Sequence, residues 1–210
     1  MTTLDHVTRP AAGEPEGALV LLHGRGADER DLAPLLDLLD PERRLLGVAP
    51  GGPLALPPGG RHWYRLGGIP TPEPETFLAS ARLLAELVDA LPVPAERVVI
   101  GGFSQGTVMS WATAFGPGRP RPAGVLALSG FLPRVDGFPL GLDAAAGMPI
   151  AVAHGLLDPV IPSAFGAEAG DAVEAAGAVL TRLASPVPHT IDPAWIEPLR
   201  AVVAAAVPRA

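Results

Sequence analysis

Short, continuously apolar segments alternate with helix-like segments along most of the chain, and this alternation is what most limits its fold. Residues 18–22 and 98–103 do not alternate between polar and apolar residues, as a strand with one solvent-exposed face would. Their continuous apolarity is typical of strands that are covered on both faces. Repeated strand–helix units predict an α/β fold, a mostly parallel, doubly wound sheet with helices on both faces. Such sheets bind ligands beyond the carboxyl ends of their strands. We therefore expect function in the loops that follow the strands.

The expected elements cover the chain from residue 17 onward. Strands are predicted at residues 17–23, 45–49, 98–103, 125–128, 150–153 and 178–183. Helices are predicted at residues 29–39, 77–91, 105–115, 163–176 and 197–207. The proline-rich stretch 50–74 is too long for an ordinary connection, so we expect a binding loop or a surface loop there.

The composition indicates one globular domain over residues 1–210. Hydrophobic residues make up 48% of the 210 residues and charged residues 18%, enough to form a full-sized core. The net charge is −7 and all 15 basic residues are arginine, with no basic run, so we expect no nucleic-acid partner.

Cysteine is absent, which excludes disulfides, thiolate nucleophiles and cysteine-bound metals. The first residues carry no basic stretch followed by an apolar one, so no signal peptide is predicted. The longest apolar runs fall far short of the roughly 18 residues that span a bilayer. We expect a cytoplasmic protein without a stable membrane anchor, and a homodimer is left open.

The pentapeptide at residues 102–106 has the form G-x-S-x-G, with Ser104 at its centre. It lies between an apolar strand and a helix-like segment, which is the setting that a nucleophile elbow requires. Glycine on both sides removes Cβ atoms that would collide where the strand turns sharply into the helix. A helix N-terminus at Ser104 would also place backbone amides beside developing negative charge. The alternative is a glycine-rich turn with an incidental serine.

A serine hydroxyl needs an adjacent base to act as a nucleophile. In hydrolases built on such an elbow the order along the chain is serine, acid, histidine. His189 is the only histidine that can follow both partners, and it lies in a loop after the strand at residues 178–183. An exposed loop histidine without a role is the alternative.

The acid is expected between Ser104 and His189. The candidates are Asp136, Asp143, Asp158, Glu168, Asp171 and Glu174. Asp158 follows a strand directly, whereas the others lie in a loop before that strand or within the helix after it. We therefore select Asp158 to orient His189 and to stabilise its imidazolium. A helix-capping aspartate before Pro159 is the alternative.

The turn after the first predicted strand contains Gly24-Arg25-Gly26. A dinucleotide-binding fingerprint would also need glycine at position 29, which is Glu29, so that reading fails. In a hydrolase, the backbone N–H of Arg25 and that of Gln105 are expected to form the oxyanion hole. Loss of one such donor typically costs about 10²–10³-fold in rate.

Four motifs together resemble the phospholipase/carboxylesterase family of α/β-hydrolases, which includes acyl-protein thioesterases. They occur in order at residues 22–26 (LHGRG), 102–106 (GFSQG), 154–162 (HGLLDPVIP) and 189–191 (HTI). The resemblance implies the same triad and oxyanion residues, with structural roles for His154 and Gly155. Pro188 stands where many members have glycine, and Arg25 where many eukaryotic thioesterases have leucine.

The substrate pocket is expected near the long loop and the acid. Trp63, in the aromatic segment that this family holds near its site, is predicted to wall the pocket, with ordinary core packing as the alternative. Val160 is predicted to face the substrate, again with packing as the alternative. The Arg25 side chain is a candidate for attracting a carboxylate-bearing ester, or else a solvated arginine.

Taken together, these residues predict a serine hydrolase that cleaves small esters or thioesters through an acyl-enzyme on Ser104, with no metal or cofactor. The chain leaves little room for a lid domain, so an open site for short or flexible substrates is expected. The alternatives are another hydrolase on this scaffold, such as a lactonase or peptidase, and a non-catalytic binding protein of the same fold.

Overall fold

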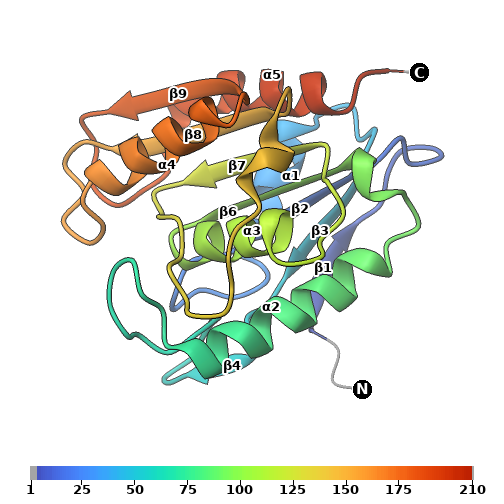
Figure 1. Cartoon of the computed structure of the whole chain (residues 1–210). Helices are drawn as coiled ribbons and strands as arrows, with labels where there is room; N and C mark the ends of the chain where they lie inside the picture. Colours follow the sequence, from blue (N-terminus) through green and yellow to red (C-terminus); the bar gives the residue numbers. More distant parts are fainter. Residues whose placement is uncertain (1–3, 210) are drawn as a thin grey trace.

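The computed structural model describes residues 4–209, which form a seven-stranded sheet flanked by helices (Figure 1). In spatial order the strands are β1 (His6–Arg9), β3 (Leu46–Pro50), β2 (Ala18–Leu22), β6 (Val98–Phe103), β7 (Gly124–Leu128), β8 (Pro149–Gly155) and β9 (Val179–Ser185). β1 runs antiparallel to β3, and all other neighbouring pairs are parallel. The prediction of a mostly parallel sheet is confirmed.

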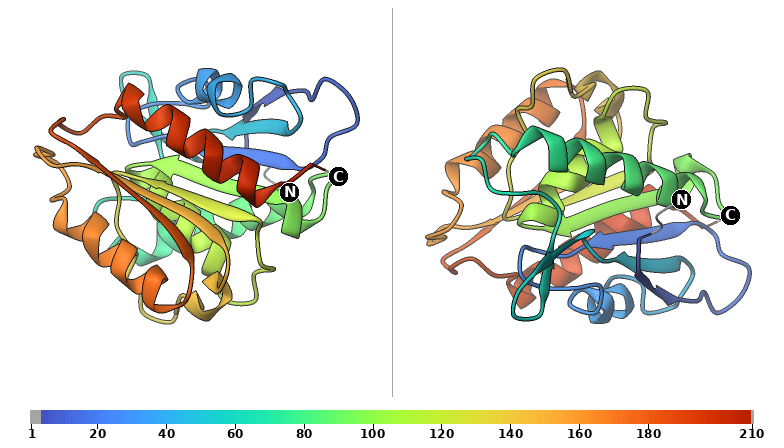
Figure 2. Two further views of the ribbon diagram at one scale, coloured as in Figure 1. Left: turned by 90° about the horizontal axis from the view of Figure 1, so that it is seen from above. Right: turned by 90° about the horizontal axis from the view of Figure 1, so that it is seen from below.

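Helices cover both faces of the sheet, as Figure 2 shows. One face carries α1 (Ala33–Leu39) and α5 (Ile196–Ala206), and the other carries α2 (Pro74–Asp89), α3 (Gln105–Phe115) and α4 (Ala164–Ala175). Short 3₁₀ turns occur at Ala95–Arg97, Leu142–Ala145 and Pro193–Trp195. Between residues 4 and 209, no helix is both long enough and apolar enough to cross a bilayer.

The continuous apolarity of the β2 sequence follows from burial on both of its faces. Leu19 and Leu21 pack with α1 and α5, whereas Val20 and Leu22 pack with α2 and α3. Successive side chains of a strand point to opposite faces, so every position of β2 lies in a core.

Two predicted helix starts were wrong, and local hydrogen bonds to acidic side chains explain both. α1 begins four residues later than expected, with Pro34 in its first turn, because the Asp28 side chain accepts the Arg30 N–H and holds a turn instead. α2 begins three residues earlier than expected, because the Glu73 side chain accepts two backbone N–H groups of its first turn.

The stretch 50–74 is more ordered than its proline content suggests. It contains a two-stranded antiparallel hairpin, β4 (Leu54–Leu56) and β5 (Gly60–His62). The Gly26 and Arg61 backbones are hydrogen-bonded, so the hairpin lies against the turn that follows β2. The loop therefore has a fixed place beside the carboxyl end of the sheet.

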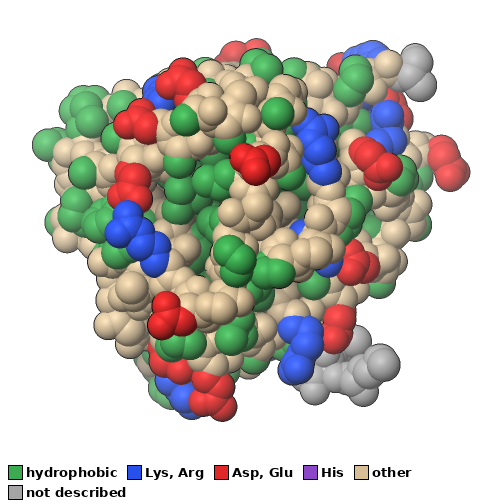
Figure 3. All heavy atoms as spheres, in the orientation of Figure 1, with side chains coloured by type: hydrophobic (Ala, Val, Ile, Leu, Met, Phe, Trp, Pro, Cys, Tyr) green, Lys and Arg blue, Asp and Glu red, His purple; other side chains and the backbone are tan. Residues whose placement is uncertain are grey.

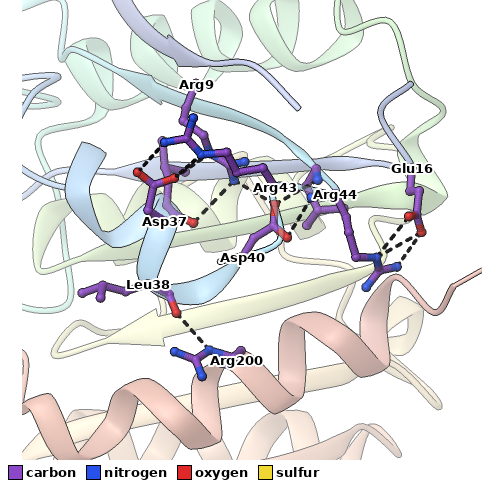
Figure 4. Close-up of polar contacts among 10 residues, drawn as sticks. Arg9, Glu16, Asp37, Leu38, Asp40, Arg43, Arg44 and Arg200 are labelled. Atoms are coloured by element: carbon purple, nitrogen blue, oxygen red, sulfur yellow. Dashed lines mark hydrogen bonds and ion pairs between the residues drawn. The ribbon is translucent and has the colours of Figure 1, made fainter. Parts of the chain in front are cut away.

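The edge strand β1, which the sequence reasoning missed, is tied to the end of α1 by a buried ion pair (Figure 4). Arg9 is only 8% exposed, and its Nη2 donates to Asp40 Oδ2 over 2.8 Å. The Asp40 carboxylate also accepts the backbone N–H groups of Arg44 and Leu45. The pair thus joins β1, α1 and the start of β3.

We predict that Arg9→Met lowers the free energy of unfolding by about 3–5 kcal/mol, because it leaves the buried Asp40 charge without its partner. Urea denaturation measures this loss. Arg134→Met is the matched control, since Arg134 and its partner Glu168 are both exposed and the change should stay within about 0.5 kcal/mol. Equal effects of the two substitutions would contradict the structural role given to Arg9.

Candidate active site

The structure brings the three predicted triad residues together at the carboxyl ends of β6, β8 and β9. His189 Nε2 lies 2.9 Å from Ser104 Oγ, and His189 Nδ1 lies 2.6 Å from Asp158 Oδ2. Since the carboxylate can only accept, Nδ1 carries the proton and Nε2 is free to accept the serine hydroxyl proton. The arrangement is a continuous chain of hydrogen bonds from nucleophile to acid.

Ser104 occupies a strained turn between β6 and α3. Its φ of 55° and ψ of −118° fall in a region that residues other than glycine rarely adopt. Holding a serine in this conformation costs about 1–3 kcal/mol. A Cβ on Gly106 would lie 1.9 Å from the Leu22 carbonyl oxygen, and one on Gly102 would lie 2.4 Å from the Gly106 carbonyl carbon. Both glycines of the pentapeptide are therefore required by close backbone approach, as expected.

The Asp158 side chain is fully enclosed, yet it is well supplied with donors. Its Oδ1 accepts the N–H of Val160 over 2.8 Å and the N–H of Ile161 over 2.9 Å. Burial alone would raise the pKa of this carboxyl, but the hydrogen bonds from His189, Ile161 and Val160 outweigh it and hold the pKa below its usual value. The group is therefore ionised at neutral pH.

The imidazole of His189 is held by packing as well as by Asp158. Its side chain is 16% exposed, and its ring lies 4.7 Å from the Phe103 ring, centroid to centroid. The loop that carries it crosses Gly155 so closely that a Cβ there would lie 2.4 Å from the Val187 carbonyl oxygen. Glycine at position 155 lets this loop approach the end of β8.

Two backbone amides near Ser104 are free to bind an oxyanion. Neither the Arg25 N–H nor the Gln105 N–H donates to any acceptor within residues 4–209. Gln105 begins α3, and a Cβ on Gly24, the neighbour of Arg25, would lie 3.5 Å from Ser104 Cβ. Both expected donors thus belong to segments that border the nucleophile.

His23, which the sequence reasoning did not select, fixes the peptide that bears the Arg25 amide. The buried imidazole donates from Nδ1 to the Gly24 carbonyl over 2.7 Å and accepts the Gly52 N–H at Nε2 over 2.9 Å. Burial lowers the pKa of His23, so the neutral ring that this pattern needs is favoured. Because C=O and N–H of a trans peptide point in opposite directions, the bond to Gly24 also sets the direction of the Arg25 N–H.

The prediction that Trp63 walls the substrate pocket needs correction. Trp63 is fully buried, so its indole presents no surface to a ligand here. Its Nε1 donates to the His23 carbonyl over 2.8 Å, and its backbone N–H donates to Gln105 Oε1 over 3.0 Å. Trp63 therefore supports the turn after β2 from within the core, which agrees with the alternative of ordinary core packing.

The other predicted pocket residues lie at the surface. Val160 is 56% exposed, which rules out the core-packing alternative, and its contact with substrate stays a prediction. Leu156 and Leu157 are exposed beside it in the loop that carries the acid. The Arg25 side chain is exposed and makes no ion pair with another described residue. In the part of the chain that the structure describes, no three histidine or carboxylate side chains gather into a candidate metal site.

The elbow, the order of the triad and the doubly wound sheet together define an α/β-hydrolase, and solved structures share this fold. The Bacillus cereus carboxylesterase aligns with a TM-score of 0.80 and 23% identity over 97% of this chain and 94% of that one. Esterase PE8 gives a TM-score of 0.76 with 26% identity over 95% and 97% of the two chains. Zea mays acyl-protein thioesterase 2 gives 0.75 with 23% identity over 97% and 99%.

The sequence profile of the phospholipase/carboxylesterase family matches residues 5–203, so the chain belongs to this family. Acyl-protein thioesterase 1 of Schizosaccharomyces pombe is 41% identical over 91 residues, 41% of this chain and 40% of that protein. The Debaryomyces hansenii protein of the same name is 36% identical over 100 residues, 45% of this chain and 41% of that protein. The alignments thus span about two fifths of these curated relatives.

We predict that Gly106→Ala both destabilises and inactivates the protein, because the added methyl group forces α3 away from the Leu22 carbonyl. Overpacking of this kind costs about 1–3 kcal/mol or more, and a displacement of about 1 Å at a nucleophile can cost 10²-fold in rate. Gly13→Ala is the control, since a Cβ at that exposed position meets nothing within 4 Å. Denaturation and ester hydrolysis measure the two effects, and wild-type values for Gly106→Ala would refute the close approach.

Proposed function

We propose that the protein is a serine hydrolase that cleaves small carboxylic esters or acyl thioesters. The observation that carries this proposal is the hydrogen-bonded chain from Ser104 Oγ through His189 to Asp158, with distances of 2.9 and 2.6 Å. Membership in the phospholipase/carboxylesterase family and the thioesterase names of its relatives support both bond types.

In the proposed reaction, Ser104 Oγ attacks the carbonyl carbon of the substrate while His189 Nε2 takes the hydroxyl proton. The oxyanion that forms accepts hydrogen bonds from the Arg25 and Gln105 amides. His189 then gives its proton to the leaving alkoxide or thiolate, which departs as an alcohol or thiol. An acyl group remains on Ser104, and water activated by His189 releases it as the acid.

The ionised state of Asp158 suits this cycle. His189 becomes an imidazolium twice per turnover, and the adjacent carboxylate stabilises that charge without taking up the proton. The depressed pKa of Asp158 keeps the carboxylate available under mildly acidic conditions as well. No described segment forms a separate lid over the carboxyl ends of the strands (Figure 1), which favours short or flexible acyl substrates.

We predict that a fluorophosphonate probe labels the folded protein at Ser104 alone and that Ser104→Ala abolishes the labelling. Asp158→Asn should retain the fold and lose about 10⁴-fold in kcat, because the wrong imidazole tautomer then faces the serine. Hydrolysis of p-nitrophenyl esters and acyl-CoA thioesters, graded by chain length, measures activity. Folded wild-type protein that neither labels nor turns over any of these substrates would favour the non-catalytic binding alternative.

A finer proposal concerns Arg25, whose guanidinium lies next to the oxyanion amides in sequence. Most arginines of the chain pair with a carboxylate, and on the face in Figure 3 the arginine side chains lie beside acidic ones. Arg25 has no such partner among the described residues and is exposed. We propose that it favours esters that carry a carboxylate.

We predict that Arg25→Ala lowers kcat/KM for a carboxylated ester about twofold to fivefold relative to a neutral ester of equal length. This is the range expected for an exposed ion pair, and it should shrink at high salt. Alanine keeps the backbone N–H, so the neutral ester reports any damage to the oxyanion hole. Arg82→Ala, an exposed arginine on α2, is the control, and an unchanged ratio in Arg25→Ala would exclude this preference.

A further inference from the structure

A second imidazole lies against the acid of the triad. His154, in β8 and four residues before Asp158, is only 5% exposed. Its Nε2 is 3.3 Å from Asp158 Oδ2, the same oxygen that accepts from His189. The catalytic carboxylate is therefore enclosed between two histidines.

His154 also holds the loop that supplies donors to the acid. Its Nε2 lies 2.9 Å from the Ile161 carbonyl oxygen, while the Ile161 N–H donates to Asp158 Oδ1. Both neighbours of Nε2 are acceptors, so the ring carries its proton there and donates. One N–H thus closes the loop at residues 158–161 around the carboxylate and places its positive end near Oδ2.

The state of the other ring nitrogen of His154, Nδ1, indicates that the imidazole is needed for its Nε2 donor. His154 Nδ1 is buried and has no hydrogen-bond partner among the described residues. A buried acceptor left in this way costs about 1–3 kcal/mol, which an apolar side chain of similar size would avoid. Packing alone therefore does not account for a histidine at this position.

The ring is also confined by helix α4. A Cβ on Gly166 would lie 2.4 Å from His154 Nδ1, so only glycine leaves the imidazole its present place. Gly166 is in the first turn of α4, so the ring is packed directly against the start of this helix.

We propose that His154 is a positioning residue that holds Asp158 in the orientation that His189 requires. The role rests on the proposed hydrolase function, and it is exerted through the Ile161 carbonyl and the Nε2–Oδ2 contact. Without the donor, the loop at residues 158–161 relaxes and the carboxylate turns away from His189. The 2.6 Å bond between His189 and Asp158 then lengthens.

The first test compares His154→Leu with His154→Gln, whose amide N–H can replace the Nε2 donor. We expect His154→Leu to lower kcat tenfold or more with KM nearly unchanged, since positioning errors of about 1 Å can cost 10²-fold. His154→Gln should recover most of this loss. The melting temperature of His154→Leu should change little, because removal of the unpaired Nδ1 offsets the Ile161 carbonyl that is left without its donor. His6→Leu, the same substitution at an exposed position of β1, is the control.

A spectroscopic readout separates this role from the proposed activity. The short bond to Asp158 should give the His189 Nδ1 proton a far-downfield NMR signal, which Asp158→Asn identifies by its loss. We expect His154→Leu to weaken or shift this signal and His154→Gln to retain it, whether or not any ester tested is a substrate. A wild-type signal in His154→Leu would overturn the proposal, as would equal damage with lowered melting temperatures in both variants.

A second pair of variants applies if His154→Leu fails to fold. Gly166→Ala pushes the ring without removing its donor, and we expect it to lower kcat and shift the His189 signal. Gly170→Ala is the control in the same helix, because its Cβ would meet only the flexible Arg182 side chain. Identical kcat values and signals in the two helix variants would overturn the proposal.

Discussion

The contact between the first turn of α3 and the end of β2 is the constraint on which the site depends. Gly106 lies so close to the Leu22 carbonyl that no side chain fits between them. Through this contact, the sharp turn at Ser104 is locked to the neighbouring strand, because β2 and β6 are also paired from Ala18↔Val98 to Leu22↔Gly102. The nucleophile and the turn that carries the Arg25 amide therefore belong to one rigid unit.

A network of neutral groups extends this unit to the long loop. His23 holds the Gly24 and Gly52 backbones, and Trp63 holds the His23 carbonyl. The Gln105 side chain completes the network by bonding to the Trp63 N–H and the Tyr64 carbonyl. Each bond satisfies a buried polar group, which makes the arrangement specific, because any other geometry would leave an unpaired group in the core.

The sequence predicted the parts of the molecule that local pattern determines. Runs of apolar residues marked six of the seven strands, all except β1, and strand position along the chain selected Asp158 over five other carboxylates. The edge strand β1 was not predicted because it has only four residues, of which one is buried, and it is held by the long-range pair of Arg9 with Asp40. The burial of Trp63 was not predicted either, because it depends on hydrogen bonds to His23 and Gln105, which are about 40 residues away in sequence.

The two ends of the triad are prepared by the same physical means. At the serine end, backbone amides of the β2 turn and of α3 have no acceptor among residues 4–209, which leaves them free for the oxyanion of the proposed reaction. At the acid end, the amides of Val160 and Ile161 and two imidazoles already surround a permanent negative charge. In the proposed mechanism, backbone amides and imidazole N–H groups serve both ends, and neither end relies on the arginines that pair with carboxylates elsewhere. Changes of surface charge should consequently affect the binding of charged substrates and leave the chemical step itself largely unaltered.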